Sequence, residues 1–439
     1  MGVVHIIGAG LAGLSAAVAL VAGGRKVHVY EAAPRAGGRC RSYFDTQLGR
    51  TIDNGGHVLL GANQAAHAFV EKIGAAHELD EIVPAAFPFI DLATGESWAL
   101  RPNAGWLPWW IFSRARRVPG TAASDYLRLG RLFGADPHDV VTDRCDPTSS
   151  VFRRLIDPLA TAVLNTEPEQ AAARPLARVL ASTLLRGECA CRISIARNGL
   201  SAAFVDPALA YLTRMGATLH FNARVDLIDV DDARVRGFLA GGRRIDIGPR
   251  DAVVLAVPSW SAAMLIPDLR VPAEHSAIVN AHFRVDRPVE LPGGRRILGL
   301  IGGTAQWLIA RGDVVSVTVS AADDLCDRPA DEVLALLWRD IADVLGGPAA
   351  AAGPPRQGTS RHVPADPRRR ARPSRPGHRP AQPRPCRRLD RDWPARHHRG
   401  RHPLGRNGRS SGPSRRLSSC KKAQLRPIFF CYALRTRTK

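Results

Sequence analysis

A glycine-rich turn close to the N-terminus has the residue types and spacing that hold a dinucleotide phosphate. Residues 8–13 read Gly-x-Gly-x-x-Gly, between the apolar run Val3–Ile7 and an alanine-rich stretch that ends at Ala22. Glycines there allow a tight turn and close backbone approach, while a helix start presents free N–H groups to phosphate. We therefore predict a phosphate-binding turn made of Gly8, Gly10, Ala12 and Gly13.

An acidic residue and a second pair of glycines follow the next apolar run, Lys26–Tyr30. Glu31 comes 18 residues after the last glycine of the turn, where its carboxylate is expected to accept hydrogen bonds from ribose hydroxyls. Gly37 and Gly38 allow further backbone approach, and Arg39 can neutralise pyrophosphate charge. A glycine turn without a ligand and a solvated arginine are the alternative interpretations.

The elements that must position these residues are those of an α/β protein. Apolar runs of four to seven residues alternate with segments of helical period. The predicted strands are Val3–Ile7, Lys26–Tyr30, Thr218–Phe221, Ala252–Val257 and Val314–Ser320. The predicted helices are Leu11–Ala22, Ala172–Leu185, Ser201–Met215 and Ala330–Leu345. A strand, helix and strand in this order predict parallel pairing in a Rossmann-like unit.

The positive charge of the chain is concentrated at one end. Its formal net charge is +21, yet 25 of the 61 Lys and Arg residues follow residue 350, against 3 of the 40 Asp and Glu residues. The first 350 residues are therefore nearly neutral. Residues 355–439 are rich in Arg, Pro, Gly and Ser and have no apolar period, so we predict a disordered basic tail.

Nothing in the composition indicates a membrane span or a metal centre. No run of eighteen apolar residues occurs, the first residues do not have the pattern of a secretion signal, and the eight cysteines are scattered except for Cys189 and Cys191. We expect no metal site, and we expect a reducing, cytoplasmic location.

The segment behind the second strand identifies the dinucleotide by resemblance. Residues 31–39 resemble the Glu-x-x-x-Arg-x-Gly-Gly-Arg extension of the flavin amine oxidase and carotenoid desaturase superfamily. This implies FAD, bound in a Rossmann-like domain of the GR2 type with an inserted α+β substrate domain. Val225 resembles the place where that superfamily lays backbone against adenine, although it could equally belong to a plain core strand.

Several phrases resemble one family within it, the hydroxysqualene dehydroxylases. They are Asp53–Gly61, Leu164–Thr166, Leu200–Phe204, Ile278–His282 and Gly302–Trp307. The resemblance implies that Gly55 and Gly56 lie at the cofactor, although the family usually has Gln where this chain has Gly56. It also implies an FAD-binding domain of residues 1–60 and 195–260, with a substrate domain of residues 61–194 and 270–345.

The family's reaction is the reductive removal of the hydroxyl of hydroxysqualene, a C30 isoprenoid used in hopanoid synthesis. His57 lies beside the expected flavin loop and could protonate the departing hydroxyl, or it could be a structural hydrogen-bonding residue. His282 is expected to be a core residue. Another isoprenoid or carotenoid desaturase and a flavin amine oxidase are the alternative enzymes.

The segment Trp106–Phe112 is unusually aromatic and is followed by Arg114, Arg116 and Arg117. Aromatic side chains next to cations suit a membrane interface, where a lipid substrate would enter. Packing inside the substrate domain is the other interpretation. We therefore expect an isoprenoid lipid as partner, a peripheral contact with the inner membrane face, and no nucleic acid.

Read in another frame, the codons of the basic tail can encode a sequence that resembles a second flavin-binding segment. When the 21 codons of Cys386–Arg406 are read one base later, they form twenty shifted codons. All twenty of these are compatible with the residues AGDWIGTGLPATIEGAIRSG. This phrase resembles the C-terminal flavin segment of the family. We therefore infer a frameshift between residues 346 and 358, which would impair this copy. A genuine basic tail that binds nucleic acid, or a flavin-binding protein without catalysis, are the interpretations of another class.

Overall fold

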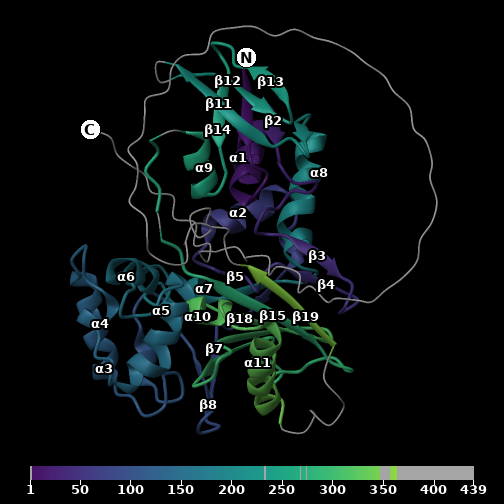
Figure 1. Cartoon of the computed structure of the whole chain (residues 1–439). Coiled ribbons are helices and arrows are strands. Elements are labelled where there is room, and N and C mark those ends of the chain that lie inside the picture. The colour runs from purple at the N-terminus through teal and green to yellow at the C-terminus, as the bar shows by residue number, and fades with distance from the viewer. Residues whose placement is uncertain (1, 232–233, 267, 273, 347–355, 363–439) are drawn as a thin grey trace, which may run out of the picture. The chain divides into compact units, whose positions relative to one another are not determined.

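The computed structural model of the chain describes residues 2–231, 234–266, 268–272, 274–346 and 356–362 (Figure 1). The predicted tail and the out-of-frame phrase lie outside these residues, except for Arg356–His362, which form strand β19. Composition did not predict this strand, because its antiparallel pairing with β15 (Ile278–Arg284) is made by backbone groups. Within the described residues, no helix is long and apolar enough to cross a membrane.

A four-stranded parallel sheet contains the predicted nucleotide-binding unit. Its strand order is β10-β2-β1-β14, with the bounds β1 Val3–Ile7, β2 Lys26–Tyr30, β10 Thr218–His220 and β14 Ala252–Leu255. Helix α1 (Leu11–Ala22) connects β1 to β2 and contacts α8 (Asp206–Arg214) beside the sheet (Figure 1). The predicted α/β class and parallel pairing are confirmed.

The predicted elements form with small differences at their ends. Four of the five strands and α1 begin and end at the predicted residues or end one residue early, and β14 ends two residues early. Helix α6 (Ala173–Ser182) is shorter than predicted at its C-terminal end. The predicted helix Ser201–Met215 begins as a π-helical turn, Ser201–Val205, before α8, whose second residue is Pro207. Proline lacks an N–H and cannot continue the hydrogen-bond ladder across this point.

A seven-stranded sheet forms the second large element. Its order is β19-β15-β18-β17-β16-β7-β8, where β18 is Val314–Val319, β17 Trp307–Arg311, β16 Ile297–Ile301, β7 Phe87–Asp91 and β8 Ser97–Leu100. One face is apolar and packs Phe283 and Val317 against Leu337 and Ile341 of α11 (Ala330–Val344). The opposite face carries polar residues, because side chains alternate along each strand.

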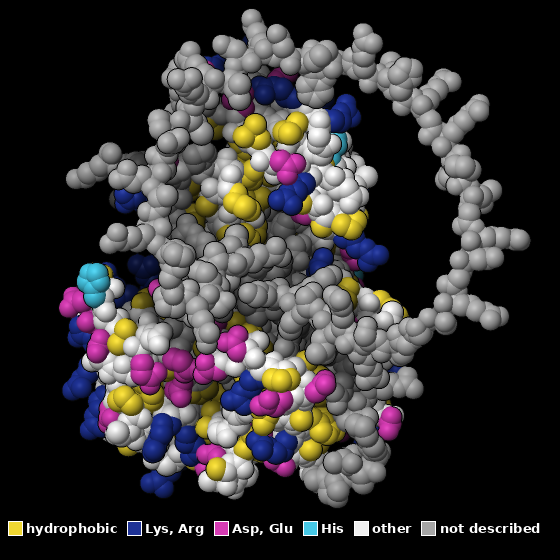
Figure 2. All heavy atoms as spheres, in the orientation of Figure 1, with side chains coloured by type: hydrophobic (Ala, Val, Ile, Leu, Met, Phe, Trp, Pro, Cys, Tyr) yellow, Lys and Arg dark blue, Asp and Glu magenta, His cyan; other side chains and the backbone are white. Residues whose placement is uncertain are grey.

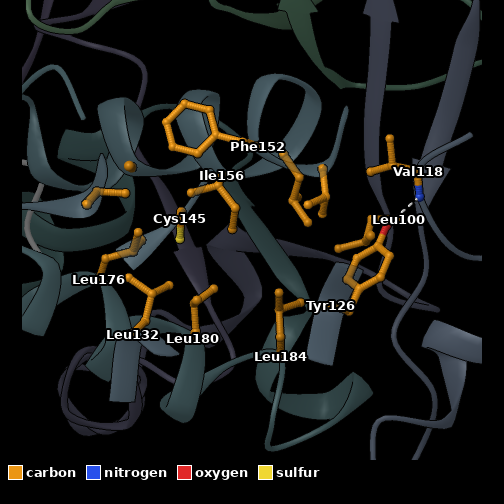
Figure 3. Close-up of a cluster of buried hydrophobic side chains, with 14 of the residues drawn as sticks. Leu100, Val118, Tyr126, Leu132, Cys145, Phe152, Ile156, Leu176, Leu180 and Leu184 are labelled. Atoms are coloured by element: carbon orange, nitrogen blue, oxygen red, sulfur yellow. Dashed lines mark hydrogen bonds between the residues drawn. The ribbon is translucent and has the colours of Figure 1, made fainter. Parts of the chain in front are cut away.

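The middle of the chain forms a helical region, whose core includes Phe89 of β7 and Leu100 of β8. It contains α3 Ala123–Arg128, α4 Val141–Arg144, α5 Asp157–Leu164, α6 and the π-helical turn Phe152–Ile156. Figure 3 shows its core, where Phe152, Ile156 and Leu176 gather around Cys145. Tyr126 lies in the same cluster and accepts a hydrogen bond from the Val118 N–H at 2.8 Å.

Smaller elements complete the fold. They are the hairpin β3 Ser42–Asp45 and β4 Arg50–Asp53, the sheet β5 Val58–Leu60, β9 Ile193–Ala196 and β6 Leu79–Ile82, and the sheet β11 Val225–Asp231, β12 Arg234–Ala240 and β13 Arg243–Asp246. The short helices are α2 Gln64–Lys72, α7 Glu188–Cys191, α9 Ser259–Leu265 and α10 Asp323–Cys326, with 3-10 turns at Ala76–Glu78, Trp109–Phe112 and Leu129–Gly134.

On the face shown in Figure 2, Lys and Arg side chains lie among Asp and Glu side chains. The predicted domain limits stay a prediction.

Candidate functional site

The turn between β1 and α1 requires glycine at two positions for internal reasons. Gly8 has φ +103°, and a Cβ there would lie 2.4 Å from the carbonyl oxygen of Ala256. A Cβ on Gly13 would lie 1.9 Å from the carbonyl oxygen of Gly8. Gly10 differs, because a Cβ there would meet no atom within 4 Å. Gly8 and Gly13 therefore close the turn, while Gly10 leaves open space beside the helix start.

Glu31 is fixed at the end of β2 by backbone donors. Its two carboxylate oxygens accept hydrogen bonds from the N–H groups of Ala9 at 2.8 Å and Ala33 at 2.9 Å. Each oxygen keeps a second lone pair. The carboxylate is therefore held in one position, with acceptor capacity left for a ribose.

The second glycine pair lies directly against the first turn. The Gly37 N–H donates to the carbonyl oxygen of Ala9 at 2.8 Å, and a Cβ on Gly38 would lie 3.2 Å from the Cα of Gly10. Both residues have positive φ, +103° and +53°. Arg39 follows, and burial lowers the pKa of its guanidinium. An arginine stays charged at neutral pH, and a buried charge is attracted to an anion such as phosphate.

These residues meet at one cavity of about 1570 Å³. Of the eleven predicted cofactor residues, eight line it: Gly8, Gly10, Ala12, Glu31, Gly37, Gly38, Arg39 and Val225. Gly13 lies behind the turn. The cavity continues to residues that the sequence did not single out as a site, including Tyr30, Asn54, Asn165, Trp260 and His275.

Asn165 is the clearest residue that sequence reasoning missed. It ends α5 with φ +52°, its Nδ2 donates to the carbonyl oxygen of Ser276 at 2.8 Å, and its Oδ1 accepts from the Ala321 N–H at 2.8 Å. It thus ties three segments together at the cavity wall. The phrase Leu164–Thr166 carried part of the resemblance, and an asparagine at the end of a helix is a frequent left-handed cap, so a signal was present.

Gly55 and Gly56 lie against the polar face of the seven-stranded sheet, and neither is among the residues that line the cavity. The Gly56 N–H donates to Oδ1 of the buried Asn280 at 3.4 Å, and Thr318 Oγ1 donates to the same oxygen at 2.9 Å. A Cβ on Gly56 would lie 2.9 Å from Thr318 Oγ1 and 3.1 Å from Ile309 Cδ1. A side chain at position 56 would therefore have to displace Thr318 or Ile309.

The two histidines singled out by the sequence lie near this face. A Cβ on Gly55 would be 3.3 Å from both His57 Nε2 and Asn280 Nδ2, so both side chains reach the Gly55 backbone. His282 is buried with its Nδ1 at 2.8 Å from Ser316 Oγ, and its Nε2 has no partner among the described residues. Burial lowers the pKa of His282 to about 4. His282 is therefore neutral at physiological pH, as a core histidine should be.

The described residues contain no group of three or more His, Cys, Asp or Glu side chains placed to hold a metal ion. Cys189 is exposed, whereas Cys191 is buried, which raises the pKa of its thiol to about 12.

Comparison with known proteins places this geometry among flavoproteins. The model of the family described as flavin containing amine oxidoreductase matches residues 11–388. Hydroxysqualene dehydroxylase of Sinorhizobium fredii is 43% identical over 343 residues, which are 78% of this chain and 82% of that protein. The protein of the same name from Rhodopseudomonas palustris is 43% identical over 344 residues, again 78% and 82%. An oxidoreductase from Methanosarcina mazei has a similar fold, with a TM-score of 0.62 at 14% identity over 82% of this chain and 87% of that one.

Proposed function

This chain belongs to the flavin-containing amine oxidoreductase family, and from that membership we propose that it is an FAD-dependent hydroxysqualene dehydroxylase. The observation that carries the proposal is the 43% identity over most of the length of two relatives with that name. Family membership alone supports an FAD-dependent oxidoreductase, because the fold hosts several reactions.

The residues around the cavity fit the ADP half of FAD. Gly10 leaves room for a pyrophosphate at the N-terminus of α1, and Glu31 has acceptor capacity for the ribose. Arg39 supplies a buried positive charge. We assign Gly8, Ala12, Gly37, Gly38 and Val225 to the cavity wall around the same half.

The proposed reaction replaces the C–O bond of the allylic alcohol with a C–H bond. Bound FAD in its reduced form supplies the hydride, and the hydroxyl leaves as water once it is protonated. This chain must therefore hold the alcohol, exclude bulk water and deliver a proton to the oxygen. His57 stays the candidate proton donor, and its Nε2 lies close to the Gly55 backbone.

The test is incubation with hydroxysqualene and a reductant, with squalene measured by gas chromatography and mass spectrometry. We expect squalene from protein that contains both flavin segments. Amine oxidation with peroxide release and no squalene would favour a flavin amine oxidase, and a newly desaturated hydrocarbon would favour a desaturase. Bound flavin without any turnover would leave a non-catalytic flavin protein.

We also propose that the reading frame shifts between residues 346 and 358. The hidden phrase at residues 386–406 supports it, and so does the alignment with the Sinorhizobium relative, which leaves about a fifth of each chain unmatched. Sequencing the gene would decide. The frameshift would be contradicted by a gene sequence in which no base is extra or missing upstream and the bases for residues 386–406 encode only the printed residues, without the hidden sequence in the shifted frame.

Finally, we propose an isoprenoid lipid as the substrate class, taken from the inner face of the cytoplasmic membrane by an otherwise cytoplasmic protein. The apolar side chains that Trp106–Phe112 expose support a peripheral contact. Co-sedimentation with vesicles, compared with a variant in which these side chains are removed, tests that contact.

A further inference from the structure

A single loop, residues 101–117, gathers the most exposed aromatic side chains of the middle of the chain. Trp106 is 73% exposed, Trp109 62%, Phe112 58% and Leu107 39%. Trp110 and Ile111 point the other way and are buried in the core of the helical region. In the 3-10 turn Trp109–Phe112, the two middle side chains thus anchor the turn in the core, while the first and last are exposed to solvent.

This loop is held in shape by hydrogen bonds at its base and within it. Leu100 and Val118, which flank it, are buried in the cluster of Figure 3, and the Arg101 N–H donates to the carbonyl oxygen of Arg116 at 2.9 Å. Asn103 donates through Nδ2 to the carbonyl oxygen of Leu107 at 2.9 Å, and its Oδ1 accepts from the Trp110 N–H at 2.9 Å. The exposed aromatic side chains therefore lie on a loop that is already ordered, so binding through them costs little further conformational entropy.

The charged residues within the loop's own sequence have one sign. Residues 97–124 contain no Asp or Glu but four arginines. Arg101, Arg114 and Arg116 are exposed, and none of them belongs to an ion pair within the described residues. Burial lowers the pKa of the Arg295 guanidinium, and the nearby charge of Arg101 lowers it further, so a fifth cation lies next to the loop.

We infer that this loop docks on an anionic lipid bilayer, with Trp106, Trp109 and Phe112 in the interface and Arg101, Arg114 and Arg116 on the lipid phosphates. The inference rests on the proposed membrane contact and adds the lipid charge it requires. Indole and phenyl rings prefer the interfacial region, and guanidinium groups bind phosphate strongly. A second copy of this chain is a poorer occupant, because a symmetric contact would bring the arginines of both loops together.

The experiment is a vesicle titration of the protein with its reading frame restored, which does not carry the basic tail, read by quenching of tryptophan fluorescence with brominated acyl chains. Vesicles of phosphatidylcholine alone are compared with vesicles containing phosphatidylglycerol. We expect strong quenching only with the anionic vesicles, and its loss in Trp106→Phe/Trp109→Phe. Since each arginine near an anionic surface contributes about a fivefold gain in affinity, Arg114→Gln/Arg116→Gln should bind about 25-fold more weakly.

A matched pair, Lys72→Gln/Arg250→Gln, controls for the loss of two charges, because both residues are exposed and outside the loop. It leaves the loop unchanged and should bind like the parent. Equal quenching with neutral and anionic vesicles, unchanged in the arginine variant, would overturn the lipid selectivity and keep the membrane contact. No quenching with either vesicle would overturn both. A dimer in sedimentation that Trp106→Ala/Trp109→Ala converts to monomer would assign the loop to self-association instead.

Discussion

Three glycines of one turn have different physical reasons to be glycine. Gly8 and Gly13 are required by the protein itself, because added side-chain atoms would overlap the carbonyl oxygens of Ala256 and Gly8. A Cβ on Gly10 would meet no atom of the described residues within 4 Å, which is the pattern expected where a ligand approaches the backbone.

This difference predicts opposite outcomes for two substitutions made in a protein with the frame restored. Gly13→Ala should lower the free energy of unfolding by about 2–3 kcal/mol, because the new methyl group cannot fit beside the backbone of Gly8. Gly10→Val should change it by about 1 kcal/mol or less but weaken FAD binding at least about tenfold. Urea unfolding and flavin titration of the same preparations measure both. Unchanged FAD affinity in Gly10→Val would remove the pyrophosphate from this turn.

The parallel sheet carries a row of histidines on neighbouring strands. The His5 Nδ1 lies 3.1 Å from the Tyr30 hydroxyl, and His220 Nε2 lies 3.4 Å from His28 Nδ1. Burial lowers the pKa of all three histidines below 6.5. Neighbouring charges lower it further: those of His28 and His220 for His5, those of His220 and Lys26 for His28, and that of Arg243 for His220. Asp251 raises the pKa of His5 by a smaller amount.

The sheet should therefore lose stability in mild acid. Histidines of the unfolded chain titrate near 6.5 and bind more protons than the folded chain just below that pH, so the free energy of unfolding falls as the pH drops below about 6.5. His28→Gln should flatten this slope between pH 7.5 and 5.5, because it removes the middle charge of the row. His77→Gln, at an exposed position, should keep it. The same slope in all three proteins would show that the row does not set the acid response.

Local sequence predicted the βαβ unit well and the seven-stranded sheet poorly. Strand β1, α1 and β2 follow one another, and their apolar periods and terminal glycines are readable within 30 residues. Strand β7 instead pairs in parallel with β16, about 200 residues later, aligning Phe89 with Gly299. Which distant strand pairs with β7 depends on how the side chains of both strands pack, and this leaves no pattern in the local sequence.

The candidate site divides in the same way. The glycines, Glu31 and Arg39 form a contiguous motif, so the sequence placed them together. Asn165 and His275 reach the cavity only because distant segments fold beside it. The phrase Gly302–Trp307 proved to be an anchoring turn, since Asp340 of α11 accepts hydrogen bonds from the N–H groups of Thr304 at 2.6 Å and Ala305 at 2.9 Å. A family phrase can therefore mark packing as readily as chemistry.

At the scale of the whole molecule, we propose that the described residues supply one half of a flavin site. Gly8, Gly10 and Glu31 line the cavity that we assign to the ADP half, and we propose that the segment resembling the second half is encoded out of frame. A shared core that lacks one element loses more than the small net stability of a domain, and it exposes apolar surface.

We therefore expect the chain as written to bind little FAD and to be poorly soluble. Expression beside a version with the frame restored tests this, with bound flavin absorbance and the soluble fraction as readouts. The restored protein should carry close to one flavin per chain, and the printed chain at least about tenfold less under subsaturating FAD. Equal flavin content in the two would mean that the lost segment is not needed for binding.

The pairing of β19 with β15 has a consequence for how this strand can vary. All seven residues of Arg356–His362 pair with β15 through main-chain groups, which every amino acid except proline can provide in full. The segment contains no proline, whereas prolines recur from Pro364 onward. In an antiparallel pair only alternate residues of an edge strand donate their N–H to the neighbouring strand, so proline would break the pairing at those positions alone. Many different residues satisfy that requirement, so this strand should tolerate substitutions that the glycine turn at the other end of the chain does not.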